Sequence, residues 1–218
     1  MIEFHTHTVF SDGKLLPAAL ARRARMLDYQ AVAFTDHADW TNYAWILERH
    51  MQSLTPRGLF CGLDLIVGLE LTHVPPPLMH EMVDSARQNG AQLILAHGES
   101  LADGVEIGTN LAAIEAGVDI LAHPGLIQEE EARLAGEKGV LLEISARSGH
   151  CLTNGHVAAV ARKHGAQVVL GSDVHVAADL PSREQRRCIA LGAGLSEEEY
   201  LQAERRAQDL LQTVRSRT

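Results

Sequence analysis

The sequence predicts a closed α/β barrel of seven parallel strands, formed by a single domain over residues 1–218. Seven β-rich or apolar runs recur along the chain, with carboxyl ends roughly 22 to 34 residues apart, about one strand, one helix and two loops. Polar side chains follow nearly every run. Closure is favoured because a barrel converges strand ends on one centre, whereas an open sheet spreads them along a line.

The expected strands are residues 2–4, 31–35, 63–71, 93–96, 120–122, 140–144 and 168–171. The intervening segments are expected to be helical. The first helix spans residues 15–28, with apolar residues at helical spacing and Pro17 near its start, where a missing amide donor is tolerated. Residues 41–62 are expected to combine a helix near 44–51 with a loop.

Helix ends are marked by glycines further along the chain. Residues 77–89, 110–116 and 155–164 stop at Gly90, Gly117 and Gly165, each suited to a left-handed helix end. Near the C-terminus, Ser196 followed by Glu199 predicts a capping box that opens a helix running to about residue 214. We see no linker, low-complexity tract or repeat that divides the chain.

Composition excludes several classes of protein. Apolar residues make up 46% and charged residues 22%, as in ordinary soluble proteins, and no apolar run reaches membrane-spanning length. The N-terminus lacks the pattern of a signal peptide, and Cys61, Cys151 and Cys188 lack metal-binding spacing, so we expect a cytoplasmic protein with reduced thiols. The net charge of −9 and 4% aromatic content make extended nucleic acid an unlikely partner.

Nine side chains at strand ends are candidate metal ligands. Imidazole and carboxylate are the usual ligands for zinc, manganese and iron. Each residue alone has an ordinary alternative: Asp12, for example, could cap a helix or shape a turn. Their joint placement favours a metal site. The candidates are His5, His7, Asp12, His37, Glu70, His97, His123, Asp173 and His175.

These residues lie in the motifs HTHT, SDG, TDH, GLE, AHG, AHP and SDVH, spread over residues 5–175. In that combination the chain resembles the polymerase and histidinol phosphatase (PHP) superfamily, whose fold is a distorted seven-stranded (β/α)7 barrel and whose members are metal-dependent phosphoesterases. The resemblance implies two to three divalent ions (Zn, Mn or Fe) in a trinuclear centre. Some relatives carry histidine at the position of Asp12.

The resemblance also distributes the ligands among three sites. It implies that Glu70 bridges the first two ions. The first ion would be held by His5, His7, Glu70 and Asp173, the second by Glu70, His97 and His123, and the third by Asp12, His37 and His175.

Two ions that share a carboxylate can lower the pKa of a water and generate hydroxide near neutral pH. We therefore expect a hydrolase acting on phosphate ester bonds, most simply a phosphatase for a small phosphorylated metabolite, with histidinol phosphate a family-level candidate. The alternatives are a phosphodiesterase, nuclease or nucleoside-phosphate phosphatase and, in another class, a noncatalytic metal-binding scaffold. A homo-oligomer is compatible with the sequence.

The polar segment after the sixth strand provides substrate-binding candidates. Arg147 is the first, because a guanidinium matches two phosphate oxygens at once, and we assign it a catalytic role with Glu70 and Asp173. His150, Asn154 and His73 are further candidates; the alternative is a self-bonded loop. Glu143 could orient Arg147 or a ligand histidine. His50, His80 and His164 fall on expected helices and are not expected to be ligands.

Overall fold

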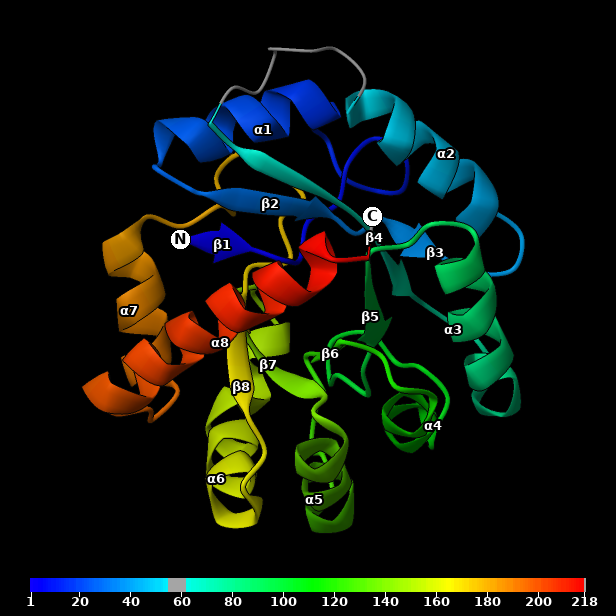
Figure 1. Ribbon diagram of the computed structural model, residues 1–218. Coiled ribbons are helices and arrows are strands. Elements are labelled where there is room, and N and C mark those ends of the chain that lie inside the picture. Colours follow the sequence, from blue (N-terminus) through cyan, green and yellow to red (C-terminus); the bar gives the residue numbers. More distant parts are fainter. Residues whose placement is uncertain (55–61, 218) are drawn as a thin grey trace.

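The computed structural model describes residues 1–54 and 62–217 and confirms the barrel (Figure 1). Neighbouring strands are all parallel, in the order β1-β2-β4-β5-β6-β7-β8. Seven strands surround the centre, as predicted. They are β1 (Ile2–Glu3), β2 (Ala31–Phe34), β4 (Asp64–Leu71), β5 (Leu93–His97), β6 (Ile120–Ala122), β7 (Leu141–Ser145) and β8 (Val168–Gly171).

A further two-residue strand, β3 (His37–Ala38), continues the path of β2 along β4. Phe34 is opposite Val67, and after an interruption His37 is opposite Glu70. The sequence did not predict β3. Its register places two candidate ligands side by side.

The barrel closes differently between its first and last strands. Thr6 and Val174, just beyond β1 and β8, form an isolated parallel bridge, and the backbone N–H of His7 donates to the carbonyl of Val174 at 2.8 Å. Within β1 and β8 themselves, the buried guanidinium of Arg186 contacts the Glu3 carboxylate at 3.0 Å and the Leu170 carbonyl at 3.3 Å. Side chains therefore join the two strands where the β-ladder is absent.

Eight α-helices lie in the described residues, outside the strands. Six begin within two residues of their predicted starts: α1 (Pro17–Met26), α2 (Tyr43–Leu54), α3 (Met79–Gln88), α4 (Thr109–Ala116), α6 (Asn154–His164) and α8 (Glu197–Arg215). Part of the segment expected to mix helix and loop forms α2, whereas residues 55–61, including Cys61, are outside the described ranges. The others are α5 (Glu129–Lys138) and α7 (Arg183–Gly192), with short 3₁₀ turns at Pro76–Leu78 and His150–Thr153.

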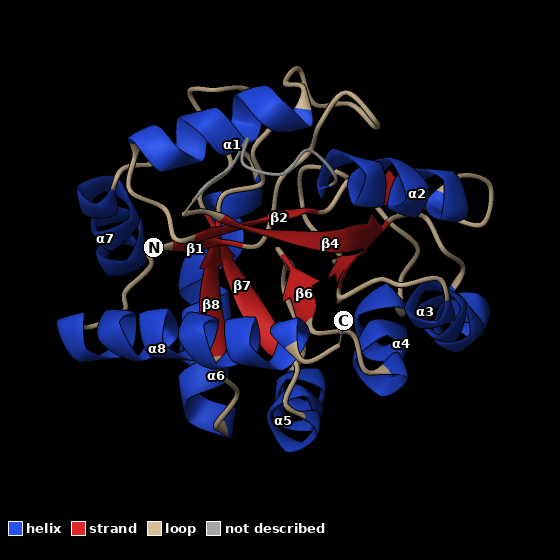
Figure 2. Cartoon of the chain, turned by 45° about the horizontal axis from the view of Figure 1, so that its top comes forward, coloured by secondary structure: helices blue, strands red, loops and turns tan. Residues whose placement is uncertain are grey.

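Two main apolar regions stabilise the barrel. One lies between the strands and the surrounding helices, and the other fills the interior. Helix α8 crosses the barrel (Figure 2) and contributes Ala207, Leu211 and Val214 to the interior cluster. The polar candidate ligands lie at the other end of the barrel, just after the carboxyl ends of the strands. In the described ranges, no helix combines the length and apolar character needed to cross a membrane.

Candidate metal centre

The nine predicted ligands come together at the carboxyl end of the barrel. Among the described residues their donor atoms form four overlapping groups, and within each group these atoms lie within 4.8 Å of one another. Strand ends and the loops that follow them supply every member. The groups are His7–Asp12–His37–His175, His5–His123–Asp173, His5–His7–Glu70 and His37–Glu70–His97.

Glu70 lies at the centre of this cluster, at the end of β4. Its Oε1 is 3.3 Å from the nearest ring nitrogens of His5, His97 and His123. Its Oε2 faces His7 Nε2 at 3.4 Å and His37 Nδ1 at 2.8 Å. The two oxygens thus face different sets of histidines, an arrangement suited to a bridging carboxylate. Burial alone would raise the pKa of Glu70, but the surrounding imidazoles hold it well below its ordinary value.

Many polar atoms in this cluster are buried without a hydrogen-bond partner. An unsatisfied buried donor or acceptor costs about 1–3 kcal/mol, so a concentration of such atoms needs a compensating ligand. Their chemistry, imidazole nitrogen and carboxylate oxygen, fits transition-metal ions. The unpartnered atoms are His5 Nε2, both ring nitrogens of His7, His97 and His123, both Glu70 oxygens and Asp173 Oδ1.

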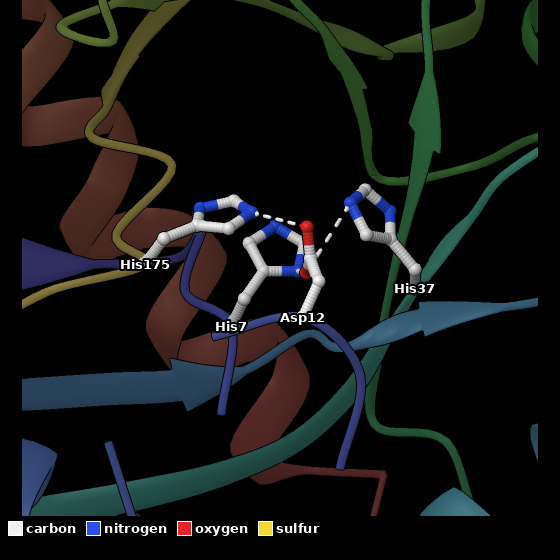
Figure 3. Close-up of side chains that lie close together, drawn as sticks. All are labelled: His7, Asp12, His37 and His175. Atoms are coloured by element: carbon white, nitrogen blue, oxygen red, sulfur yellow. Dashed lines mark hydrogen bonds and ion pairs between the residues drawn. The ribbon is translucent and has the colours of Figure 1, made fainter. Parts of the chain in front are cut away.

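The third predicted group is the most open (Figure 3). Asp12 Oδ2 lies 3.0 Å from His175 Nε2, and Oδ1 lies 3.7 Å from His37 Nε2 and 3.8 Å from His7 Nδ1. The Asp12 side chain is 56% exposed, so solvent reaches the cluster from this side. Burial acts to lower the pKa of His175, but Asp12 and Asp173 raise it to about 10.

The loop that carries Asp12 is fixed by a glycine and by a buried aspartate. A Cβ on Gly13 would lie 2.2 Å from the His7 carbonyl oxygen, so only glycine permits this close approach. Asp36 Oδ1 accepts from the backbone N–H of Thr8 at 2.7 Å and from Ser11 Oγ at 2.6 Å. These contacts position the turn from which Asp12 projects.

Asp36 is held in turn by His50, a residue of α2. His50 Nε2 lies 2.7 Å from Asp36 Oδ2, and His50 Nδ1 lies 3.2 Å from the Gly68 carbonyl. Both side chains are fully buried. His50 is outside the four groups of candidate ligands found among the described residues, but it supports their geometry. Sequence reasoning did not identify this pair, although Asp36 directly precedes His37.

Glu143, in the middle of β7, orients two of the candidate ligands. His5 Nδ1 donates to Glu143 Oε1 at 2.7 Å, which turns Nε2 toward Glu70. The backbone N–H of His123 donates to Oε2 at 2.9 Å. Burial opposes protonation of His5, but Glu143 and the neighbouring carboxylates raise its pKa well above the ordinary value. A carboxylate behind a ligand imidazole fixes the ring and increases its basicity.

Arg147 lies beside Asp173 and His175. Its Nε is 3.3 Å from Asp173 Oδ2, and its Nη1 donates to the Asp173 carbonyl at 3.1 Å and lies 2.8 Å from His175 Nδ1. About 31% of the Arg147 side chain remains exposed. The guanidinium therefore borders the cluster and still faces solvent.

His150 also borders the cluster, beside His123 and Asp173. Its ring stacks on His123 with centroids 4.0 Å apart, and its Nδ1 is 2.6 Å from Ser100 Oγ. The other ring nitrogen, Nε2, faces Asp173 Oδ2 at 3.6 Å. Burial and the neighbouring His123 lower the pKa of His150 to about 4.

The other two substrate-binding candidates, Asn154 and His73, have fewer contacts with the cluster. The Asn154 amide accepts from the backbone N–H of Ser145 and donates to its carbonyl, so its hydrogen-bonding groups are engaged within the loop. His73 is exposed, with φ of 56°, and with His37 and His97 lines a hollow of about 310 Å³.

Known proteins resemble this chain over most of its length. The family model described as PHP domain matches residues 3–103. An uncharacterized protein of Methanocaldococcus jannaschii is 44% identical over 199 residues, covering 90% of this chain and 91% of the relative. A probable phosphatase of Clostridium novyi is 26% identical over 81% of this chain and 79% of its own. Ribonuclease P protein component 3 of Methanosarcina barkeri is 27% identical over 92% and 84%.

Solved structures share the fold at low sequence identity. A chain of archaeal ribonuclease P with mature tRNA aligns with a TM-score of 0.71 and 16% identity, covering 99% of this chain and 91% of that one. Histidinol phosphate phosphatase of Lactococcus lactis, complexed with zinc, L-histidinol and phosphate, aligns with a TM-score of 0.65 and 17% identity, covering 89% and 94%. The same barrel thus occurs in a phosphatase and in a ribonucleoprotein.

Proposed function

This chain belongs to the PHP family, and from that membership we propose that it is a metal-dependent phosphoesterase that hydrolyses a small phosphomonoester. The observation that carries the proposal is the position of Glu70, whose two fully buried oxygens face five imidazoles within 3.4 Å. A scaffold without chemistry does not need a buried carboxylate and so many unpaired imidazole nitrogens, because each is costly to bury.

The residues fit two to three divalent ions of the zinc, manganese or iron type. His5, His7, Glu70 and Asp173 would hold one; His97 and His123 would share Glu70 around a second; Asp12, His37 and His175 would hold a third. When bound, the ions supply an acidified water as nucleophile and neutralise charge on the phosphate oxygens.

The remaining side chains position the substrate and preserve the ligands. Arg147 borders Asp173 and His175, where its guanidinium can bind a phosphoryl group and stabilise the charge that spreads over its oxygens. His150, beside His123, is uncharged near neutral pH and can donate to or accept from a substrate oxygen. Glu143 keeps His5 turned toward Glu70 during turnover.

The substrate class rests on the size of one hollow beside the cluster and on the relatives. The hollow beside His37 and His97 measures about 310 Å³, enough for a metabolite-sized group. The similar protein of Clostridium novyi is called a probable phosphatase, and the Lactococcus lactis structure holds L-histidinol and phosphate. Histidinol phosphate is therefore one candidate among small phosphomonoesters.

A second candidate function follows from the resemblance to ribonuclease P component 3, which covers 92% of this chain. In that case the barrel would bind RNA or assemble with an RNA-containing complex. The net charge of −9 opposes a general nucleic-acid surface, because affinity for phosphate backbones depends on cationic side chains. We therefore rank RNA binding second.

One screen separates the two candidates. Full-length protein reloaded with zinc, manganese or iron is assayed against phosphomonoesters and phosphodiesters, and its affinity for structured RNA is measured by mobility shift over a salt series. Metal-dependent release of phosphate from a monoester, without salt-sensitive RNA binding, supports the proposed phosphatase. RNA binding with no hydrolysis in any metal would replace it with the second candidate.

A further inference from the structure

A large cavity opens beside the third ligand group. It measures about 860 Å³ and reaches Asp12 and His175 at one end. The loops that follow β1, β7 and β8 line it together with α7, and Pro181 and Ile189 add apolar surface. A phosphoryl group held at the metal cluster would therefore leave the rest of its substrate facing this space.

Lys14 projects into this cavity from the loop after β1. Its backbone N–H donates to the His175 carbonyl at 2.8 Å. Asp12, two residues earlier in the same turn, contacts the His175 ring. Gly13 lies between them. The close approach of Gly13 to His7 fixes this turn. One rigid turn thus places a candidate metal ligand and a cation at neighbouring points of the cavity wall.

The ammonium of Lys14 has no partner in the described structure. The chain has two other lysines, and both are engaged: Lys138 Nζ donates to the Glu115 carbonyl at 3.1 Å, and Lys163 Nζ pairs with Glu129 at 2.6 Å. Lys14 forms neither an ion pair nor a side-chain hydrogen bond within residues 1–54 and 62–217.

The acidic groups of the same wall are already engaged. Asp12 contacts His175, and Asp179 Oδ2 accepts from the backbone N–H groups of His175 and Val176 at 2.9 Å each. The guanidinium of Arg147 is directed to Asp173 and His175. Lys14 therefore differs from Arg147 in this cavity: within the described residues its charge is not already paired with a carboxylate.

We propose that this cavity binds the leaving group of the substrate and that Lys14 selects a leaving group with a second anionic substituent, a carboxylate or a second phosphate. This inference rests on the proposed phosphomonoesterase function. The phosphoryl group to be cleaved lies at the ligand cluster, and the second anion pairs with the Lys14 ammonium. Lys14 is a specificity residue that does not contact the reacting bond.

The test compares two esters that differ at one end. The ratio of kcat/KM for 3-phosphoglycerate to kcat/KM for glycerol 3-phosphate is measured in the metal-loaded wild type and in Lys14→Ala, Lys14→Arg and Lys138→Ala. We expect the ratio to fall about 10-fold in Lys14→Ala, mainly through KM, because an ion pair to the carboxylate is lost. Lys14→Arg should recover part of it, and Lys138→Ala should match the wild type. An unchanged ratio in Lys14→Ala overturns the proposal.

A binding experiment keeps this inference separate from the proposed function. Calorimetric titration of the metal-loaded protein compares 4-phosphonobutyrate with butylphosphonate, which have the same length and cannot be hydrolysed. Tighter binding of the carboxylate compound, abolished by Lys14→Ala and kept in Lys138→Ala, supports the Lys14 site even if no ester is turned over. Equal binding of the two compounds to the wild type contradicts it.

Discussion

Glu143 occupies the space that a side chain at Gly171 would need. A Cβ at Gly171 would lie 1.8 Å from Glu143 Oε1, the oxygen that accepts from His5 Nδ1. The two residues are on adjacent strands, with Glu143 opposite Val169 and Ser145 opposite Gly171. The absence of a side chain in β8 therefore allows a carboxylate of β7 to enter the barrel and orient a ligand on the chain beyond β1.

Gly171→Ala should displace the Glu143 carboxylate and release His5 from its fixed orientation. We expect a loss on the order of 10- to 100-fold in metal affinity or activity, the usual effect of removing a partner behind a ligand histidine. Metal titration and kcat/KM under saturating metal measure the two effects. The control is Gly192→Ala at the end of α7, where a Cβ meets no atom within 4 Å. Wild-type metal affinity and rate in Gly171→Ala would show that Glu143 does not control the site.

Glu70→Gln and His123→Ala test the centre of the cluster. Gln keeps the size of the side chain but removes the negative charge that faces five imidazoles, and Ala removes one of those imidazoles. We expect hydrolysis to fall by orders of magnitude with the barrel retained, because ligand contacts set the acidity and position of the nucleophile. Elemental analysis should show fewer bound ions per chain, and circular dichroism should show the wild-type fold. Full activity in either metal-loaded variant would contradict the assignment.

Arg147→Ala and Arg147→Lys test the phosphate contact. Alanine should keep the bound metals but lower kcat/KM by about 10- to 1,000-fold, or roughly 1.4 to 4 kcal/mol of transition-state stabilisation. Lysine should restore only part of the rate, because it retains the charge but not the planar pair of donors. Steady-state kinetics on metal-matched proteins measure both. Equal kcat/KM values in all three proteins would reduce Arg147 to a structural partner of Asp173 and His175.

The fold and the gathering of the nine candidate ligands were predictable because their signals are local. Apolar runs that end in histidine or a carboxylate mark strand ends, and parallel strands bring those ends together, so His97 and His123 could be placed near Glu70 from order alone. The capping box of Ser182 and Gln185 also marks the start of α7 in the sequence, although we did not predict a helix start there.

The supporting contacts were not predictable because they depend on packing between distant segments. His50 reaches Asp36 only because α2 lies against β4, and no spacing in the sequence records that contact. Asn154 illustrates the converse: its position after a strand is compatible with substrate binding, but its amide bonds the backbone of Ser145. Packing also leaves the Lys14 ammonium unpaired within residues 1–54 and 62–217, and no local pattern in the sequence indicates this.

The contacts of Asp36 with His50 and Ser11 should make the free energy of unfolding depend on pH in a defined acidic range. Burial opposes ionisation, but His50 and Ser11 lower the pKa of Asp36 to about 2, below its usual value of 3.8. A carboxyl whose folded pKa is depressed stabilises the fold above its unfolded pKa, and that contribution disappears as pH falls through the folded pKa. The window is therefore about pH 4 to pH 2, and a shift of that size corresponds to about 2 kcal/mol.

Urea unfolding of metal-free wild type and Asp36→Asn between pH 5 and pH 2.5 measures this contribution. The stability gap between the two proteins should narrow as the pH falls, whereas Asp84→Asn, at a side chain that is 61% exposed, should show no such gap. A gap of constant size over this range would mean that the charge of Asp36 does not contribute to holding the loop that carries Asp12.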